Sequence, residues 1–95
     1  MTKEREVLTF LYNNLFSKVL SLEGVTDSLK KNIQDNIKAL NDRSAEGMIN
    51  YFWSNIAGEE IKKVLAKRLE EEGFFEFEKV VEEFKIRFND VWLKG

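Results

Sequence analysis

The chain has 95 residues, a net charge of −2 and an apolar content of 43%, a composition typical of one small globular domain over residues 1–95. It contains no cysteine and no histidine, which excludes disulfides, thiolate nucleophiles, imidazole bases and metal sites built from these residues. No stretch approaches the roughly 18 apolar residues of a membrane span, and the N-terminal residues carry charges of both signs. We therefore expect a cytoplasmic protein that does not enter a membrane.

The first half of the chain predicts two helices. Apolar residues recur at spacings of three and four over residues 3–22, and Gly24 follows as a helix end. The second helix is expected over residues 27–41, with Thr26 or Asp27 as its N-cap and an apolar stripe that includes Ile33 and Ile37. No segment alternates with period two for long enough to predict a strand.

The second half predicts a long helix over residues 45–72, with Ser44 as N-cap, and a last helix over residues 75–93. Gly58 either kinks the long helix or separates two helices. The fold class is thus predicted to be all-α, as an antiparallel up-down-up-down four-helix bundle, with five helices as the alternative. In such a bundle, the turn after residue 41 lies at the same end as the N-terminus of the first helix.

The turn between the second and third predicted helices resembles the start of an EF-hand calcium loop. That family places oxygen-bearing side chains at alternate positions, then a glycine bend and a backbone carbonyl. The matching residues here are Asp42, Ser44, Glu46, Gly47, Met48, Ile49 and Asn50. The resemblance implies that Asp42, Ser44, Glu46, Met48 and Asn50 bind calcium as metal ligands.

The closing position of that loop departs from the family, because Trp53 stands in place of the bidentate glutamate. In the predicted bundle, Glu4, Glu6 or Asp90 from a neighbouring helix could replace it. Calcium affinity is then expected to be weak, on the order of 10⁻⁴ to 10⁻³ M. The alternative interpretation is structural: Ser44 or Asp42 caps the third helix, and Glu46 interacts favourably with its dipole.

A second acidic group gathers at the other end of the predicted bundle. It consists of Glu23, Asp27 and Glu70 to Glu72. These carboxylates could bind a cation loosely, or they could simply face solvent. Lys67 with Glu71 and Arg68 with Glu72 are spaced as ordinary helical ion pairs, which favours the second interpretation.

Neither catalysis nor nucleic-acid binding is indicated. Adjacent glutamates at 59–60, 70–72 and 82–83 come without a nucleophile or a phosphate-binding glycine loop. A basic strip runs from Lys62 to Arg68, but glutamates flank it and the sequence pI is about 5.3. We therefore expect a non-enzymatic protein that does not bind nucleic acid.

The aromatic run at the start of the last helix suggests a protein contact. Phe77, Trp53 and Trp92 fit the core stripes of their helices, whereas Phe74 and Phe75 fall outside a clean stripe. At least one of these two is expected to be exposed at the turn, where it could bind a protein partner or form a homodimer. Binding of a protein partner, or homodimer formation, through this surface is the alternative function to calcium binding.

Across its whole length the chain also resembles small helical proteins of hyperthermophilic archaea. Its high lysine and glutamate content suits that origin, whereas its eight asparagines, a thermolabile residue type, argue against it.

Overall fold

The computed structural model describes all of residues 1–95, of which 78% are helical and none lies in a strand. The all-α prediction is confirmed. In chain order the elements are α1 (Lys3–Leu11), η1 (Tyr12–Phe16), α2 (Ser17–Leu20), α3 (Asp27–Asn41), α4 (Ala45–Tyr51), η2 (Phe52–Ile56), α5 (Glu59–Glu71), α6 (Phe77–Arg87) and α7 (Asp90–Lys94). Because η1 and η2 continue their neighbouring α-helices, these elements form six helices.

Short polar side chains begin four of these helices. Thr26 accepts a hydrogen bond from the Leu29 amide at 3.3 Å, and Ser44 accepts one from the Gly47 amide at 3.1 Å. Thr2 and Asn89 cap α1 and α7 in the same way. Each cap satisfies a backbone N–H that has no partner inside its own helix. Of the two N-caps predicted for α3, Thr26 is the one observed, and the prediction of Ser44 as N-cap of α4 is confirmed.

Two interruptions raise the number of helices from the predicted four or five to six. The predicted helix 45–72 is divided at Ala57 and Gly58, where a Cβ on Gly58 would lie 2.9 Å from the carbonyl oxygen of Ser54. Only glycine allows this close approach. The predicted helix 75–93 starts at Phe77 and is divided at Phe88 and Asn89, because Asn89 caps a new helix.

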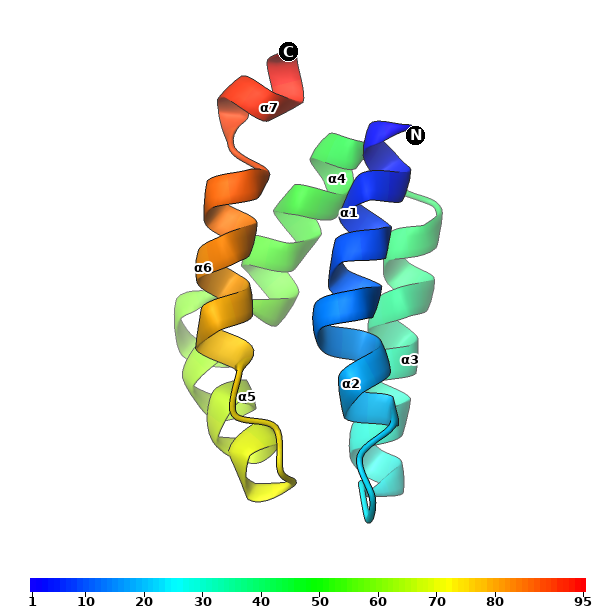
Figure 1. The fold of residues 1–95 in the computed structure, drawn as a ribbon, viewed down its shortest axis with the longest axis vertical. Helices are drawn as coiled ribbons and strands as arrows, with labels where there is room; N and C mark the ends of the chain where they lie inside the picture. Colours follow the sequence, from blue (N-terminus) through cyan, green and yellow to red (C-terminus); the bar gives the residue numbers. More distant parts are fainter.

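The α2–α3, α3–α4 and α5–α6 connections lie at the ends of an elongated molecule, whereas the α4–α5 connection lies near its middle (Figure 1). The N-terminus, the α3–α4 connection and α7 share one end, as predicted for the turn after residue 41. The α2–α3 and α5–α6 connections share the other end. At the latter, Gly73 ends α5 with φ +104°, a left-handed conformation that favours glycine.

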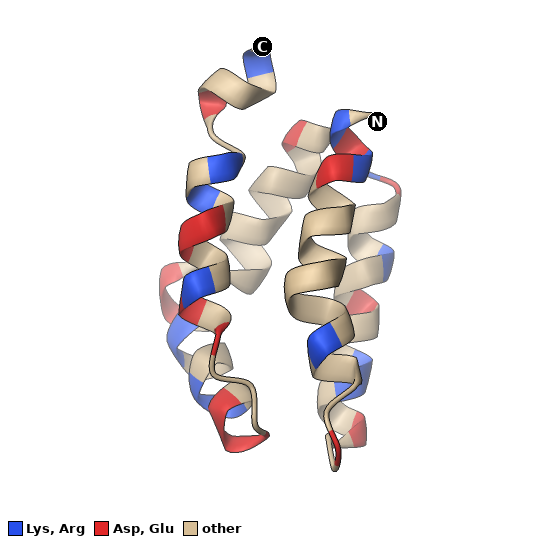
Figure 2. Ribbon diagram, in the orientation of Figure 1, with Lys and Arg blue, Asp and Glu red and all other residues tan.

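Both π-helical segments lie in uncharged stretches of the chain (Figure 2). In η1 the Ser17 amide donates to the Tyr12 carbonyl, and in η2 the Ala57 amide donates to the Phe52 carbonyl at 2.7 Å. Such wide turns are rare and recur near functional sites in proteins generally. No sequence pattern predicted them.

The core contains side chains from every helix except α7, in a single cluster of 21 buried residues. Its largest fully buried side chains include Phe16, Phe52 and Phe84. Asn36 is the single buried polar residue, and its side-chain amide oxygen accepts a hydrogen bond from the Tyr51 hydroxyl at 2.7 Å. None of the helices has the length and apolar content that crossing a membrane requires.

Candidate functional site

The segment that resembles a calcium loop is mostly helical. The connection between α3 and α4 consists of residues 42–44, and Ala45 already begins α4. Ser44 is the N-cap of α4, and Glu46 lies in its first turn. Met48 is buried, and its carbonyl accepts the Phe52 amide within the helix. The capping interpretation of Ser44 is therefore confirmed.

The remaining oxygen-bearing side chains of the segment point to solvent. Asp42, Glu46 and Asn50 are exposed. No group of three or more aspartate, glutamate, cysteine or histidine residues is placed to hold a metal ion. Calcium binding by Asp42, Ser44, Glu46, Met48 and Asn50 stays a prediction.

Of the three carboxylates predicted to complete that site, the structure places one beside it. The Glu4 carboxylate accepts a hydrogen bond from the Ala45 amide at 3.0 Å. Glu6 instead accepts one from the indole N–H of Trp92 at 3.1 Å, and Asp90 lies exposed in the first turn of α7. Both glutamates thus join different helices at this end of the molecule.

At the opposite end, one of the clustered carboxylates is engaged in a similar way. Glu72 accepts hydrogen bonds from the Thr26 amide at 2.6 Å and from its hydroxyl at 3.0 Å. It also pairs with Arg68 at 3.8 Å, whereas the predicted pair of Lys67 with Glu71 does not form. The rest of this acidic group, namely Glu23, Asp27, Glu70 and Glu71, is exposed.

The aromatic turn separates its two phenylalanines. Phe74 is 4% exposed and belongs to the core, whereas Phe75 is 73% exposed. Trp53 and Trp92 pack against the core, as their stripes predicted. Of the predicted partner surface, Phe75 is therefore the available aromatic side chain.

The hydroxyl of Tyr51 has a raised pKa. Burial raises the pKa of its hydroxyl above the ordinary value, the nearby Arg43 opposes that shift, and Asp35 adds to it. The Arg43 guanidinium lies over the Tyr51 ring at 4.8 Å. Because the hydroxyl already donates to Asn36, we assign Tyr51 a role in joining α4 to α3.

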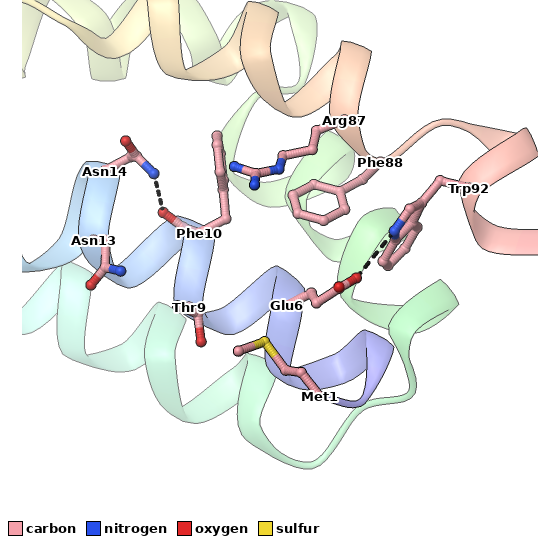
Figure 3. Close-up of a pocket in the computed structure, with 9 residues that line it drawn as sticks. All are labelled: Met1, Glu6, Thr9, Phe10, Asn13, Asn14, Arg87, Phe88 and Trp92. Carbon is pink, nitrogen blue, oxygen red and sulfur yellow. Dashed lines mark hydrogen bonds between the residues drawn. The ribbon is translucent and has the colours of Figure 1, made fainter.

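Two hollows in the surface were not predicted from the sequence. One is an open groove of about 310 Å³ along α5, lined by Asn32, Glu60, Ile61, Val64, Leu65 and Arg68. The other is a cleft of about 450 Å³ between the α1–η1 helix and the α6–α7 region (Figure 3). The apolar spacing beyond Gly58 predicts one core stripe from Ile61, Val64, Leu65 and Leu69, and this prediction is wrong for Ile61 and Val64, which are exposed. The cleft joins residues more than 70 positions apart in sequence, so no local pattern could reveal it.

Comparison of the chain with protein-family models, curated proteins and solved structures finds no significant match. The α5 groove, the cleft and the exposed side chains are therefore the features from which a function can be inferred.

Proposed function

We propose that this protein is a non-catalytic helical module that forms a homodimer by pairing α5 with α5 of a second copy. The observation that carries the proposal is the exposure of apolar side chains in the α5 groove. Val64 is 71% exposed and Ile61 is 43% exposed, and both line the same groove. Adjacent exposed apolar residues of this kind are typical of protein contacts.

The charges of the groove suit a second copy of the same helix. Glu60, Val64 and Arg68 are spaced four residues apart and so share one face of α5. If the two-fold axis is perpendicular to α5 and passes at Val64, the two helices run antiparallel and Glu60 of each copy lies opposite Arg68 of the other. The groove is thus complementary to itself in charge.

Both charged residues keep bonding capacity for such a contact. Glu60 forms no ion pair within the chain, where the pairs are Lys18 with Glu76 and Arg68 with Glu72. Arg68 also donates to the Ser28 hydroxyl at 2.6 Å. A guanidinium has five N–H donors, so Arg68 retains donors for a carboxylate of the second copy.

The groove supports this function better than the predicted aromatic turn does. Phe75 is exposed beside a buried Phe74, so it offers a single apolar side chain. Singly exposed apolar residues are normal on protein surfaces. In the dimer we propose, Phe75 stays outside the contact.

Sedimentation at increasing protein concentration tests the dimer. The mass is expected to rise from the 11.2 kDa of the monomer toward twice that value. Val64→Lys places two like charges at the symmetry axis and should leave only monomer. Ile86→Lys is the matched control, because Ile86 is 67% exposed on α6 and should not affect association.

Charge reversal tests the orientation of the two helices. Glu60→Arg and Arg68→Glu should each weaken the dimer, and the double variant should restore it, because the reversed charges again face each other. A wild-type protein that stays monomeric at every concentration would contradict the proposal. So would equal effects of Val64→Lys and Ile86→Lys.

Weak calcium binding by residues 42–50 is the second candidate function. The observation that favours it is the position of Glu4, whose carboxylate lies beside this segment at the Ala45 amide. Together with the exposed Asp42, it would supply part of the missing charge. Saturable amide shifts over residues 42–50 at millimolar calcium, lost in Asp42→Ala and reduced in Glu4→Gln, would support the site.

Two other outcomes of the calcium titration have different meanings. Shifts centred on Glu70 to Glu72 would transfer cation binding to the opposite end of the molecule. Absence of saturable shifts would leave Ser44 with its capping role alone.

A further inference from the structure

The cleft between α1–η1 and α6–α7 has the size and lining of a small-molecule site. Its volume of about 450 Å³ falls within the common range for ligand pockets. Thr9, Phe10, Asn13 and Asn14 line one side, whereas Arg87, Phe88 and Trp92 line the other (Figure 3). Met1 and Glu6 complete it. Polar groups from two distant segments thus surround an aromatic interior.

Arg87 supplies a positive charge that forms no ion pair within the chain. Its side chain reaches from α6 toward α1 (Figure 3), and its guanidinium lies 5.5 Å from the centre of the Phe10 ring. The ion pairs of the chain involve other residues, and Arg87 donates no side-chain hydrogen bond. Contact with an aromatic ring holds the guanidinium in place while its donors stay free.

The remaining polar groups of the cleft form no ion pair with Arg87, although the Glu6 carboxylate keeps its negative charge. The single carboxylate in the lining is Glu6, which accepts the Trp92 indole N–H at 3.1 Å. One amide hydrogen of Asn14 is used on the Phe10 carbonyl at 2.9 Å. Asn13 is exposed and its side chain makes no hydrogen bond within the chain. Free donors are therefore available on both sides of the cleft.

The aromatic rings of the lining pack edge to face against one another. Phe10 meets Phe88 at 5.4 Å and Phe88 meets Trp92 at 4.8 Å between ring centres, both nearly perpendicular. Ring edges carry partial positive charge. We propose that the cleft binds a small organic carboxylate with an apolar body. Arg87 holds the carboxylate, and Trp92, the ring of the lining that is only partly buried, contacts the apolar body.

Phenylacetate is a suitable probe, and 2-phenylethanol is its uncharged counterpart. Titration of the full-length chain with phenylacetate should give saturable amide shifts in residues 6–14 and 87–92. The affinity for 2-phenylethanol should be lower than that for phenylacetate by a factor of about ten or more, because a charge-assisted bond is lost. Inorganic phosphate should bind more weakly than phenylacetate, because it makes no contact with the rings.

Variants of α6 identify the contact. Arg87→Met should weaken phenylacetate binding about tenfold or more, and Arg87→Lys should recover part of it by restoring charge without the planar donor pair. Lys85→Met is the matched control, because Lys85 is an exposed cation of the same helix outside the cleft. Unchanged chemical shifts far from the cleft would show that each variant is folded.

Three results would overturn the proposal. They are absence of saturable shifts with phenylacetate, equal affinity for phenylacetate and 2-phenylethanol, and equal losses in Arg87→Met and Lys85→Met. The cleft and the α5 groove share no residue, so the titration can be repeated in Val64→Lys. Binding should be the same in that variant, whether or not the protein forms a dimer.

Discussion

The aromatic interior and the outer face of α5 use their apolar side chains differently. Phe84 is fully buried and packs against Phe10, Phe52, Trp53 and Phe88, with a stacked distance of 3.8 Å to Phe52. On α5, Ile61 and Val64 remain exposed. Substitutions in the first region should therefore change the free energy of unfolding, and substitutions in the second should change association.

The largest effect is expected for Phe84→Ala. It removes a ring that joins α6 to η2 and α1, and leaves a cavity in the core. The free energy of unfolding should fall by about 3–5 kcal/mol. Denaturant unfolding measures this, with Phe84→Leu as a milder control. A loss below about 1 kcal/mol would mean that the aromatic contacts do not hold these helices together.

Tyr51→Phe should have the next largest effect. It leaves the side-chain amide oxygen of the buried Asn36 without its hydrogen bond, and the free energy of unfolding should fall by about 1–3 kcal/mol. Tyr12→Phe is the matched control, because Tyr12 is 52% exposed and its hydroxyl makes no hydrogen bond in the chain. A similar loss in both variants would contradict the role of the Asn36–Tyr51 pair.

The same tyrosine predicts a dependence of stability on alkaline pH. Because the pKa of Tyr51 is raised in the folded state, the folded protein holds this proton more tightly than the unfolded chain does. The contribution is complete below the ordinary value of 10.0 and is lost as pH rises through the folded pKa. Unfolding measured between neutral pH and about pH 11 should show this decline, and Tyr51→Phe should flatten it.

Trp92→Phe should lower the free energy of unfolding by about 1 kcal/mol. It keeps an aromatic ring beside Phe88 but removes the indole N–H that donates to Glu6. Trp53→Phe is the control for loss of an indole, because the Trp53 indole makes no hydrogen bond within the chain. Combining Trp92→Phe with Glu6→Ala should add little, since both changes remove the same bond. If the loss in the double variant equals the sum of the two single losses, the bond does not contribute to stability.

The smallest effect on folding is expected for Val64→Lys. Val64 lies outside the core, so the free energy of unfolding of the monomer should change by less than about 0.5 kcal/mol. Thermal unfolding at low protein concentration measures this. A large loss of unfolding free energy would show that Val64 stabilises the monomer. The outer face of α5 would then not differ from the aromatic interior in its effect on stability.

Part of the fold and little of the site could be predicted from the sequence. The caps Thr26 and Ser44 and the apolar stripes are local signals, because an N-cap bonds within three residues and a stripe follows the helical period. Arg87 and Asn13 carry no such signal, since they line one cleft only when α6 packs beside η1. The division at Asn89 was missed because the apolar stripe continues through Trp92.

The sequence by itself determined the helical class, the positions of most helix starts and most of the residues that form the core. Backbone hydrogen bonds and the apolar period act over a few residues, so they can be read locally. Tertiary structure alone decided that Phe74 is buried and Phe75 exposed, and that Glu4, Glu6 and Glu72 bond to other helices. These outcomes depend on which helix lies opposite each side chain, and helix packing brings together residues that are distant in the sequence.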